Sequence, residues 1–130
     1  MRGWMLFAVL FLGFTVAGCT NKISGNVTVD GKALSFKSCR SGQVYGFAGV
    51  ELKAASGERL RLVMTPSGHS VAVYFNASST TGVTIGRCGP FELRRQNSTV
   101  NKVTNVAGKA TLDCKTSVAI KGEVSFENCH

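Results

Sequence analysis

The stretch NVTVDGKALSF, residues 26–36, sets a pattern that the rest of the chain repeats. Apolar residues alternate with polar ones on both sides of Asp30-Gly31, a dipeptide that favours a two-residue hairpin turn because both positions tolerate positive φ. A turn of that length places Val27 opposite Leu34, so both side chains lie on one face. The stretch therefore predicts a β-hairpin with one buried face.

The same period of two continues along the chain, and helix signals are nearly absent. It predicts strands in QVYGFAGVELKA (43–54), ERLRLVM (58–64), SVAVYF (70–75) and SVAIKGEVSFE (117–127). Shorter strands are predicted at 83–85, 91–95, 103–106 and 109–113, separated by Gly86, Gly89-Pro90 and Gly108. Short strands spaced by roughly ten residues predict an all-β fold, an antiparallel β-sandwich or small barrel of about 8–10 strands.

Two of these segments also predict which side chains face the core. In residues 58–64, Leu60 and Leu62 point inward and the arginines between them point outward. In residues 43–54, one face carries Val44, Ala48, Val50 and Leu52, and the other carries Tyr45 and Phe47.

Residues 1–18 have the pattern of a targeting segment. Arg2 precedes the fourteen residues WMLFAVLFLGFTVA, an apolar run shorter than the roughly 20 residues that a transmembrane helix needs. The following Val16-Ala17-Gly18-Cys19 resembles the lipobox of bacterial lipoproteins. That resemblance implies diacylglycerol on the Cys19 thiol, cleavage before Cys19 and a further acyl chain such as palmitate on the new amino group. The alternative is an ordinary signal peptide followed by a chance cysteine.

The lipobox resemblance divides the chain into a lipoprotein signal peptide (1–18), a lipidated N-terminus with a short tether (19–22) and a single β domain (23–130). Four tether residues reach roughly 14 Å, so the domain is expected to rest near the lipid head groups. The resemblance implies a cell-envelope location. In enteric-type sorting, an Asp directly after the lipidated cysteine retains a lipoprotein in the inner membrane. This chain has Thr20 at that position, which favours the outer membrane.

The chain has five cysteines, an odd number for an oxidising compartment. Lipid on Cys19 leaves four, which can form two disulfides in any of three connectivities: Cys39, Cys88, Cys114 and Cys129. The preferred pairing is Cys39 with Cys88 and Cys114 with Cys129, because the second pair brackets one predicted hairpin. A zinc site formed with His130 would lack any C-x-x-C pair, so neither metal nor cofactor is predicted.

Positive charge dominates the part of the chain after residue 18. Without Arg2, fourteen basic residues face seven acidic ones, a net charge of +7. A patch of Arg59, Arg61, Arg87, Arg94 and Arg95 is predicted to attract anionic lipid or cell-wall polymer. The alternative is a merely solvated basic surface. Nucleic acid is not expected as a partner, because the compartment is wrong and aromatic residues are not clustered with the charge.

One stretch nearly matches a catalytic motif. Gly68-His69-Ser70-Val71-Ala72 is close to the G-x-S-x-G elbow of hydrolases, and Asp113 and His130 follow in the hydrolase order. The residues after Ser70 alternate as a strand, however, whereas an elbow leads into a helix. We therefore predict a non-enzymatic envelope lipoprotein that binds or scaffolds. The alternative is a small hydrolase of envelope polymers or lipids, which would need Ser70, Asp113 and His130 in one pocket.

As a whole, the mature chain resembles small uncharacterised lipoproteins of myxobacterial type. The resemblance rests on SCRSGQVYGFAGVEL, RRQNSTVNKVTNV and the terminal SFENCH. It implies no activity.

Overall fold

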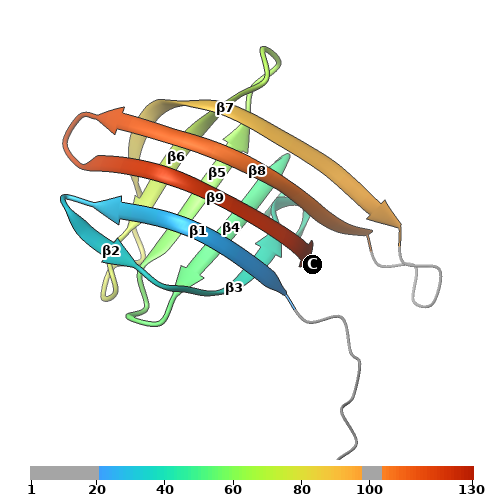
Figure 1. The fold of residues 1–130 in the computed structure, drawn as a ribbon, viewed down its shortest axis with the longest axis horizontal. Helices are drawn as coiled ribbons and strands as arrows, with labels where there is room; N and C mark the ends of the chain where they lie inside the picture. Colours follow the sequence, from blue (N-terminus) through green and yellow to red (C-terminus); the bar gives the residue numbers. More distant parts are fainter. Residues whose placement is uncertain (1–20, 98–103) are drawn as a thin grey trace, which may run out of the picture.

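Nine antiparallel strands form one curved sheet in the computed structural model, which describes residues 21–97 and 104–130 (Figure 1). The strands are β1 (Lys22–Val29), β2 (Lys32–Leu34), β3 (Phe36–Ser41), β4 (Gly49–Ala54), β5 (Arg59–Met64), β6 (His69–Phe75), β7 (Val83–Asn97), β8 (Thr104–Lys115) and β9 (Ala119–Cys129). A 3₁₀ helix, η1 (Gly42–Tyr45), precedes β4.

The strand order is β2-β1-β9-β8-β7-β6-β5-β4-β3. Its two outermost strands, β2 and β3, follow each other in the chain, so the sheet curls into a nearly closed barrel (Figure 1). The prediction of an all-β antiparallel fold is confirmed. Of the two architectures predicted, the small barrel fits the nearly closed sheet better than the sandwich does.

The opening hairpin has the predicted register. Val27 pairs with Leu34, and both side chains are buried. Asp30 and Gly31 have φ values of 50° and 80°, as a two-residue turn of this kind requires. The Asp30 carboxylate also accepts a 2.9 Å hydrogen bond from the Ala119 backbone N–H, which fixes the turn against β9.

The barrel interior is filled by apolar side chains from alternate strand positions. The largest fully buried ones include Leu52, Leu60, Leu62, Leu112, Ile120, Val124 and Phe126. Leu60 and Leu62 point inward as predicted, while Arg59 and Arg61 lie on the outer face. Burying a side chain of this size contributes about 1.5–3 kcal/mol, so this core is the main source of stability.

Two predicted strand boundaries are wrong. β7 runs unbroken past Gly86 and Gly89-Pro90, and β8 runs unbroken past Gly108. The first half of β7 pairs with β6 and the second half with β8. A Cβ atom on Gly89 would lie only 2.5 Å from the Thr111 carbonyl oxygen of β8. This glycine therefore marks a close approach of β7 and β8 rather than a strand end.

The prediction of a strand from residue 43 is also wrong. Residues 42–45 form η1, capped by the Ser41 hydroxyl, which accepts a 3.3 Å hydrogen bond from the Gln43 backbone N–H. Val44 is consequently 61% exposed and does not face the core. Val50 and Leu52, which lie in β4, face inward as predicted.

The four remaining cysteines form two disulfides, Cys39–Cys129 and Cys88–Cys114. The preferred pairing of Cys39 with Cys88 and of Cys114 with Cys129 is therefore wrong. Within the β8–β9 hairpin, Cys114 pairs with Ile120 beside the turn, whereas Cys129 pairs with Val106 at the open end. The two cysteines bracket the hairpin in sequence but lie at opposite ends of it.

The seam between β3 and its neighbours β1 and β9 is closed by side chains. The Cys39–Cys129 disulfide joins β3 to β9, with 5.0 Å between the two Cα atoms. Beside it, the Asn21 amide donates a 2.7 Å hydrogen bond to the Asn128 carbonyl and accepts a 3.1 Å bond from the Cys39 backbone N–H. One asparagine and one disulfide thus connect three strands where the chain enters the barrel.

We expect Gly122→Ala to lower the free energy of unfolding by about 3 kcal/mol, because the substitution adds backbone strain to a steric overlap. Gly122 has φ of 135°, and its Cβ would overlap the Asn26 carbonyl oxygen on β1. Gly31→Ala is the matched control, because Gly31 also has positive φ but has no atom within 4 Å of its Cβ position. It should cost about 1 kcal/mol. Equal losses in denaturant unfolding would contradict the close contact of β1 with β9.

Candidate anion-binding site

Four basic side chains meet on the outer face of the barrel. The strand register pairs Arg40 of β3 with Glu51 of β4, and Glu51 with Arg61 of β5. In the next row, Lys53 of β4 pairs with Arg59 of β5. Paired residues project from the same face of a sheet, so these four cations lie on the same face as one carboxylate, Glu51.

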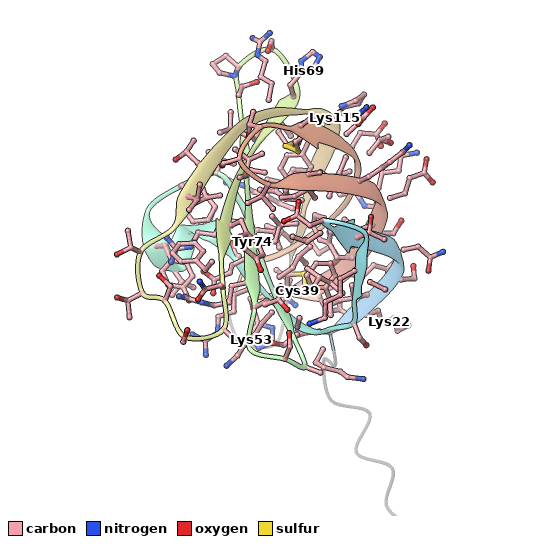
Figure 2. All side chains as sticks on the ribbon, turned by 90° about the vertical axis from the view of Figure 1, so that its left-hand side faces the viewer. Lys22, Cys39, Lys53, His69, Tyr74 and Lys115 are labelled. Atoms are coloured by element: carbon pink, nitrogen blue, oxygen red, sulfur yellow. A yellow bond between two sulfur atoms is a disulfide. The ribbon has the colours of Figure 1, made fainter. Side chains whose placement is uncertain are left out.

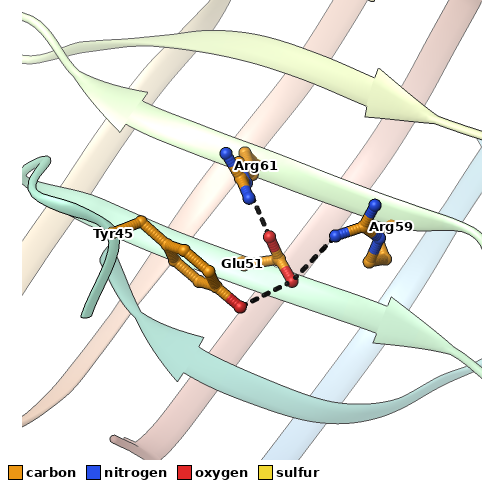
Figure 3. A network of polar contacts seen from close by, with 4 residues as sticks. All are labelled: Tyr45, Glu51, Arg59 and Arg61. Atoms are coloured by element: carbon orange, nitrogen blue, oxygen red, sulfur yellow. Dashed lines mark hydrogen bonds and ion pairs between the residues drawn. The ribbon is translucent and has the colours of Figure 1, made fainter. Parts of the chain in front are cut away.

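Glu51 lies at the centre of this cluster and is only 5% exposed (Figure 3). Its Oε2 accepts a 2.6 Å hydrogen bond from Arg61 Nε, and its Oε1 lies 3.8 Å from Arg59 Nη1. The Tyr45 hydroxyl donates a 3.4 Å hydrogen bond to Oε1. The carboxylate is therefore satisfied from three sides and holds both guanidinium groups in fixed positions.

Aromatic rings fix the two arginines further. The Arg61 guanidinium lies 4.4 Å from the centre of the Tyr45 ring and 4.8 Å from that of Phe75. Arg59 lies 4.4 Å from the same Phe75 ring. Phe75 is buried although it points outward, because the arginines cover it. Such cation–π contacts contribute about 0.5–2 kcal/mol each and favour a preorganised surface.

A hollow of about 530 Å³ adjoins this cluster. Arg40, Lys53 and Arg59 line it together with one acidic side chain, Glu51. The hydroxyl-bearing residues along it are Ser38, Tyr45, Ser78, Ser79 and Thr80. Cations and hydroxyl donors around one hollow suit a phosphate or carboxylate group, to which guanidinium and ammonium groups donate charge-assisted hydrogen bonds.

Of the five arginines predicted to form a patch, only Arg59 lines this hollow, and Arg61 contacts its lining residue Glu51. Arg87 pairs with Val71 and donates a 3.4 Å hydrogen bond to the Ser67 hydroxyl. Arg94 and Arg95 lie in the second half of β7, where it pairs with β8. The predicted set is therefore divided among separate parts of the barrel.

Sequence analysis missed Arg40 and Lys53. The outward orientation of Lys53 could have been predicted from the sequence, because Lys53 follows the inward-facing Leu52 in the same strand. The position of Arg40 could not, because only the register between β3 and β4 brings it beside Glu51. Figure 2 shows Lys53 at the lower edge of the barrel, away from the His69 turn at the top.

The residues of the hydrolase alternative lie apart. Ser70 is fully buried, and its hydroxyl donates a 3.4 Å hydrogen bond to the Gly89 carbonyl. Asp113 is exposed on β8 opposite Lys121, and the His130 ring contacts the Asn128 carbonyl. Of five hollows in the described ranges, none is lined by all three residues. Within residues 21–97 and 104–130, no group of three His, Cys, Asp or Glu residues could hold a metal ion.

A second polar cluster has its hydrogen bonds satisfied internally. The buried Glu58 carboxylate accepts a 2.9 Å hydrogen bond from the Ser56 hydroxyl and another from the Tyr74 hydroxyl. Burial raises the pKa of Tyr74 to about 12, and the hydrogen bond and negative charge of Glu58 act in the same direction. Tyr74 therefore remains a neutral donor at physiological pH and ties β6 to the start of β5.

No protein-family model, curated protein or solved structure matches this chain. In the described part of the chain, no helix is long and apolar enough to cross a membrane.

Proposed function

We propose that this protein is a bacterial envelope lipoprotein whose barrel binds an anionic envelope component without catalysis. Lipid on Cys19 anchors it to a membrane, and the hollow beside β3, β4 and β5 binds the anion. The observation that carries the proposal is the convergence of Arg40, Lys53 and Arg59 on one hollow. The net charge of +7 after residue 18 acts over a longer range to attract such a ligand.

The cations of the hollow retain charge that the protein does not neutralise. Glu51 is matched by Arg59 and Arg61, and the only other described ion pair joins Lys109 to Glu92. Arg40 and Lys53 therefore have no ion-pair partner within the described residues. A phosphate or carboxylate of an anionic lipid or cell-wall polymer would supply one, and the planar guanidinium of Arg40 suits bidentate binding.

The sequence after the lipid site supports an outer-membrane location in a host with two membranes. Thr20 follows Cys19, where an Asp would favour retention in the inner membrane. Only Thr20 separates Cys19 from Asn21, which is the first residue that the structure describes and directly precedes β1. The anchored barrel therefore stays close to the membrane surface.

We expect the chain from Thr20 onward to bind anionic vesicles at low salt and to dissociate at about 1 M salt, where the screening length is only about 3 Å. Arg40→Gln/Lys53→Gln should weaken this binding by roughly 30-fold, because each cation near an anionic surface contributes about 1 kcal/mol. Vesicle co-sedimentation across a lipid titration measures the effect.

Arg94→Gln/Arg95→Gln is the matched control, because it removes the same charge from a part of β7 outside the hollow. It should change the affinity much less. Equal weakening by the two variants would show that net charge alone governs binding. Absence of binding at every salt concentration would contradict the proposal and show that the basic residues form only a solvated surface.

A further inference from the structure

The 3₁₀ helix η1 presents an apolar surface to solvent. Three large hydrophobic side chains are exposed within the described residues: Val44 at 61%, Val83 at 44% and Tyr45 at 41%. Val44 and Tyr45 are adjacent in η1, whereas Val83 is isolated at the start of β7. Val44 and Tyr45 are thus the one adjacent pair among the exposed large hydrophobic side chains of the described residues, and their position decides what they can contact.

This surface lies beside the point where the chain enters the barrel. Asn21 and Val44 line the same hollow of about 330 Å³, together with Arg40 and His130. Asn21 is held there by its hydrogen bonds to Cys39 and Asn128. Only Thr20 separates Cys19 from Asn21 in the sequence, and two residues of chain span at most about 7 Å. Any lipid on Cys19 therefore enters the bilayer close to η1.

We infer that Val44 and Tyr45 insert into the interfacial layer of the bilayer that holds Cys19. This inference rests on the proposed lipid anchor. Tyrosine suits that layer because its ring is apolar and its hydroxyl is polar. The Tyr45 ring is already positioned, since its hydroxyl contacts Glu51 and its ring packs beside Phe47 with 6.2 Å between ring centres.

Two points of contact fix the orientation of the barrel. The lipid holds the chain at Cys19, and η1 holds the barrel beside it. Arg40 lines both the hollow at the tether and the hollow proposed to bind the anion. The anion site therefore opens at the level of the lipid head groups, where Arg40 and the exposed Lys22 meet anionic lipid.

A single tryptophan tests the inserted surface. The only tryptophan of the chain is Trp4, so a chain beginning at Cys19 has none. With the other four cysteines in disulfides, Cys19 is its only free thiol and can be joined to a maleimide lipid in vesicles. Val44→Trp should then show blue-shifted emission and lose roughly half of it to lipids brominated near the head group, as an interfacial residue does.

Val83→Trp is the matched control, because Val83 is also exposed but lies on β7, four strands from β3 in the sheet order. It should retain its emission. Quenching of V44W with V83W unaffected supports the inference. Equal quenching of the two probes, or none in either, overturns it. The lipid is attached chemically, so either result is independent of whether cells lipidate Cys19.

Discussion

Replacing Cys39 and Cys129 together by alanine should lower the free energy of unfolding by about 4.5 kcal/mol, the largest loss that we expect from any pair of substitutions here. The disulfide spans 90 residues, so its loss frees a long loop in the unfolded chain. It also connects β3 to β9 across a seam where the described strands share no hydrogen-bonded ladder. Denaturant unfolding of the oxidised protein measures the change.

Replacing Cys88 and Cys114 by alanine is the matched control. Both pairs are buried, so the lost side-chain volume is similar, but this disulfide spans only 26 residues and joins β7 to β8. Its removal should cost about 3.5 kcal/mol. A larger loss for the Cys88–Cys114 variant than for the Cys39–Cys129 variant would show that the seam is held mainly by other contacts.

Replacing Cys19 by alanine should abolish lipid labelling and move most of the protein from the membrane to the soluble fraction. Each buried methylene contributes about 0.8 kcal/mol, and two or three acyl chains make an anchor effectively permanent. The membrane contacts proposed for η1 and for the basic hollow are weaker than such an anchor, so the association that remains should be sensitive to salt. Fatty-acid labelling and membrane fractionation measure both effects.

Thr20→Ala serves as the control, because it leaves the Cys19 thiol and the Asn21 contacts in place. Its labelling and membrane retention should match those of the unaltered protein. Unchanged labelling of the Cys19→Ala variant would rule out the lipobox interpretation, whatever the barrel binds.

Local patterns predicted the parts of the fold that depend on neighbouring residues. The Asp30-Gly31 turn fixed the pairing of Val27 with Leu34, and the alternation around Leu60 fixed which face of β5 is buried. The same reasoning placed strand ends at Gly89 and Gly108, where the structure has continuous strands. A glycine signals a break and a close backbone approach equally well, and the sequence does not distinguish them.

The candidate site depends on long-range register, which alternation does not contain. Arg59 was predicted as part of a basic patch, but its basic neighbours in the hollow, Arg40 and Lys53, come from β3 and β4. The disulfide pairing failed for the same reason, since Cys39 and Cys129 meet only when the sheet curls round on itself. Charge and cysteine number were therefore informative, whereas their arrangement in space had to come from the structure.

The pairing of β1 with β9 joins two distant parts of the chain and should therefore form late in folding. Strands β3 to β8 pair with neighbours in sequence, but Lys22 at the start of β1 pairs with Glu127 near the end of β9. If the chain is exported N-terminus first, β1 has no main partner until β9, the last of the described strands, has followed. Pairing between residues so distant in sequence slows folding and prolongs the exposure of unpaired strand edges. We therefore expect closure of β1 onto β9 to be a late step of folding, before which the unpaired edge of β1 favours aggregation.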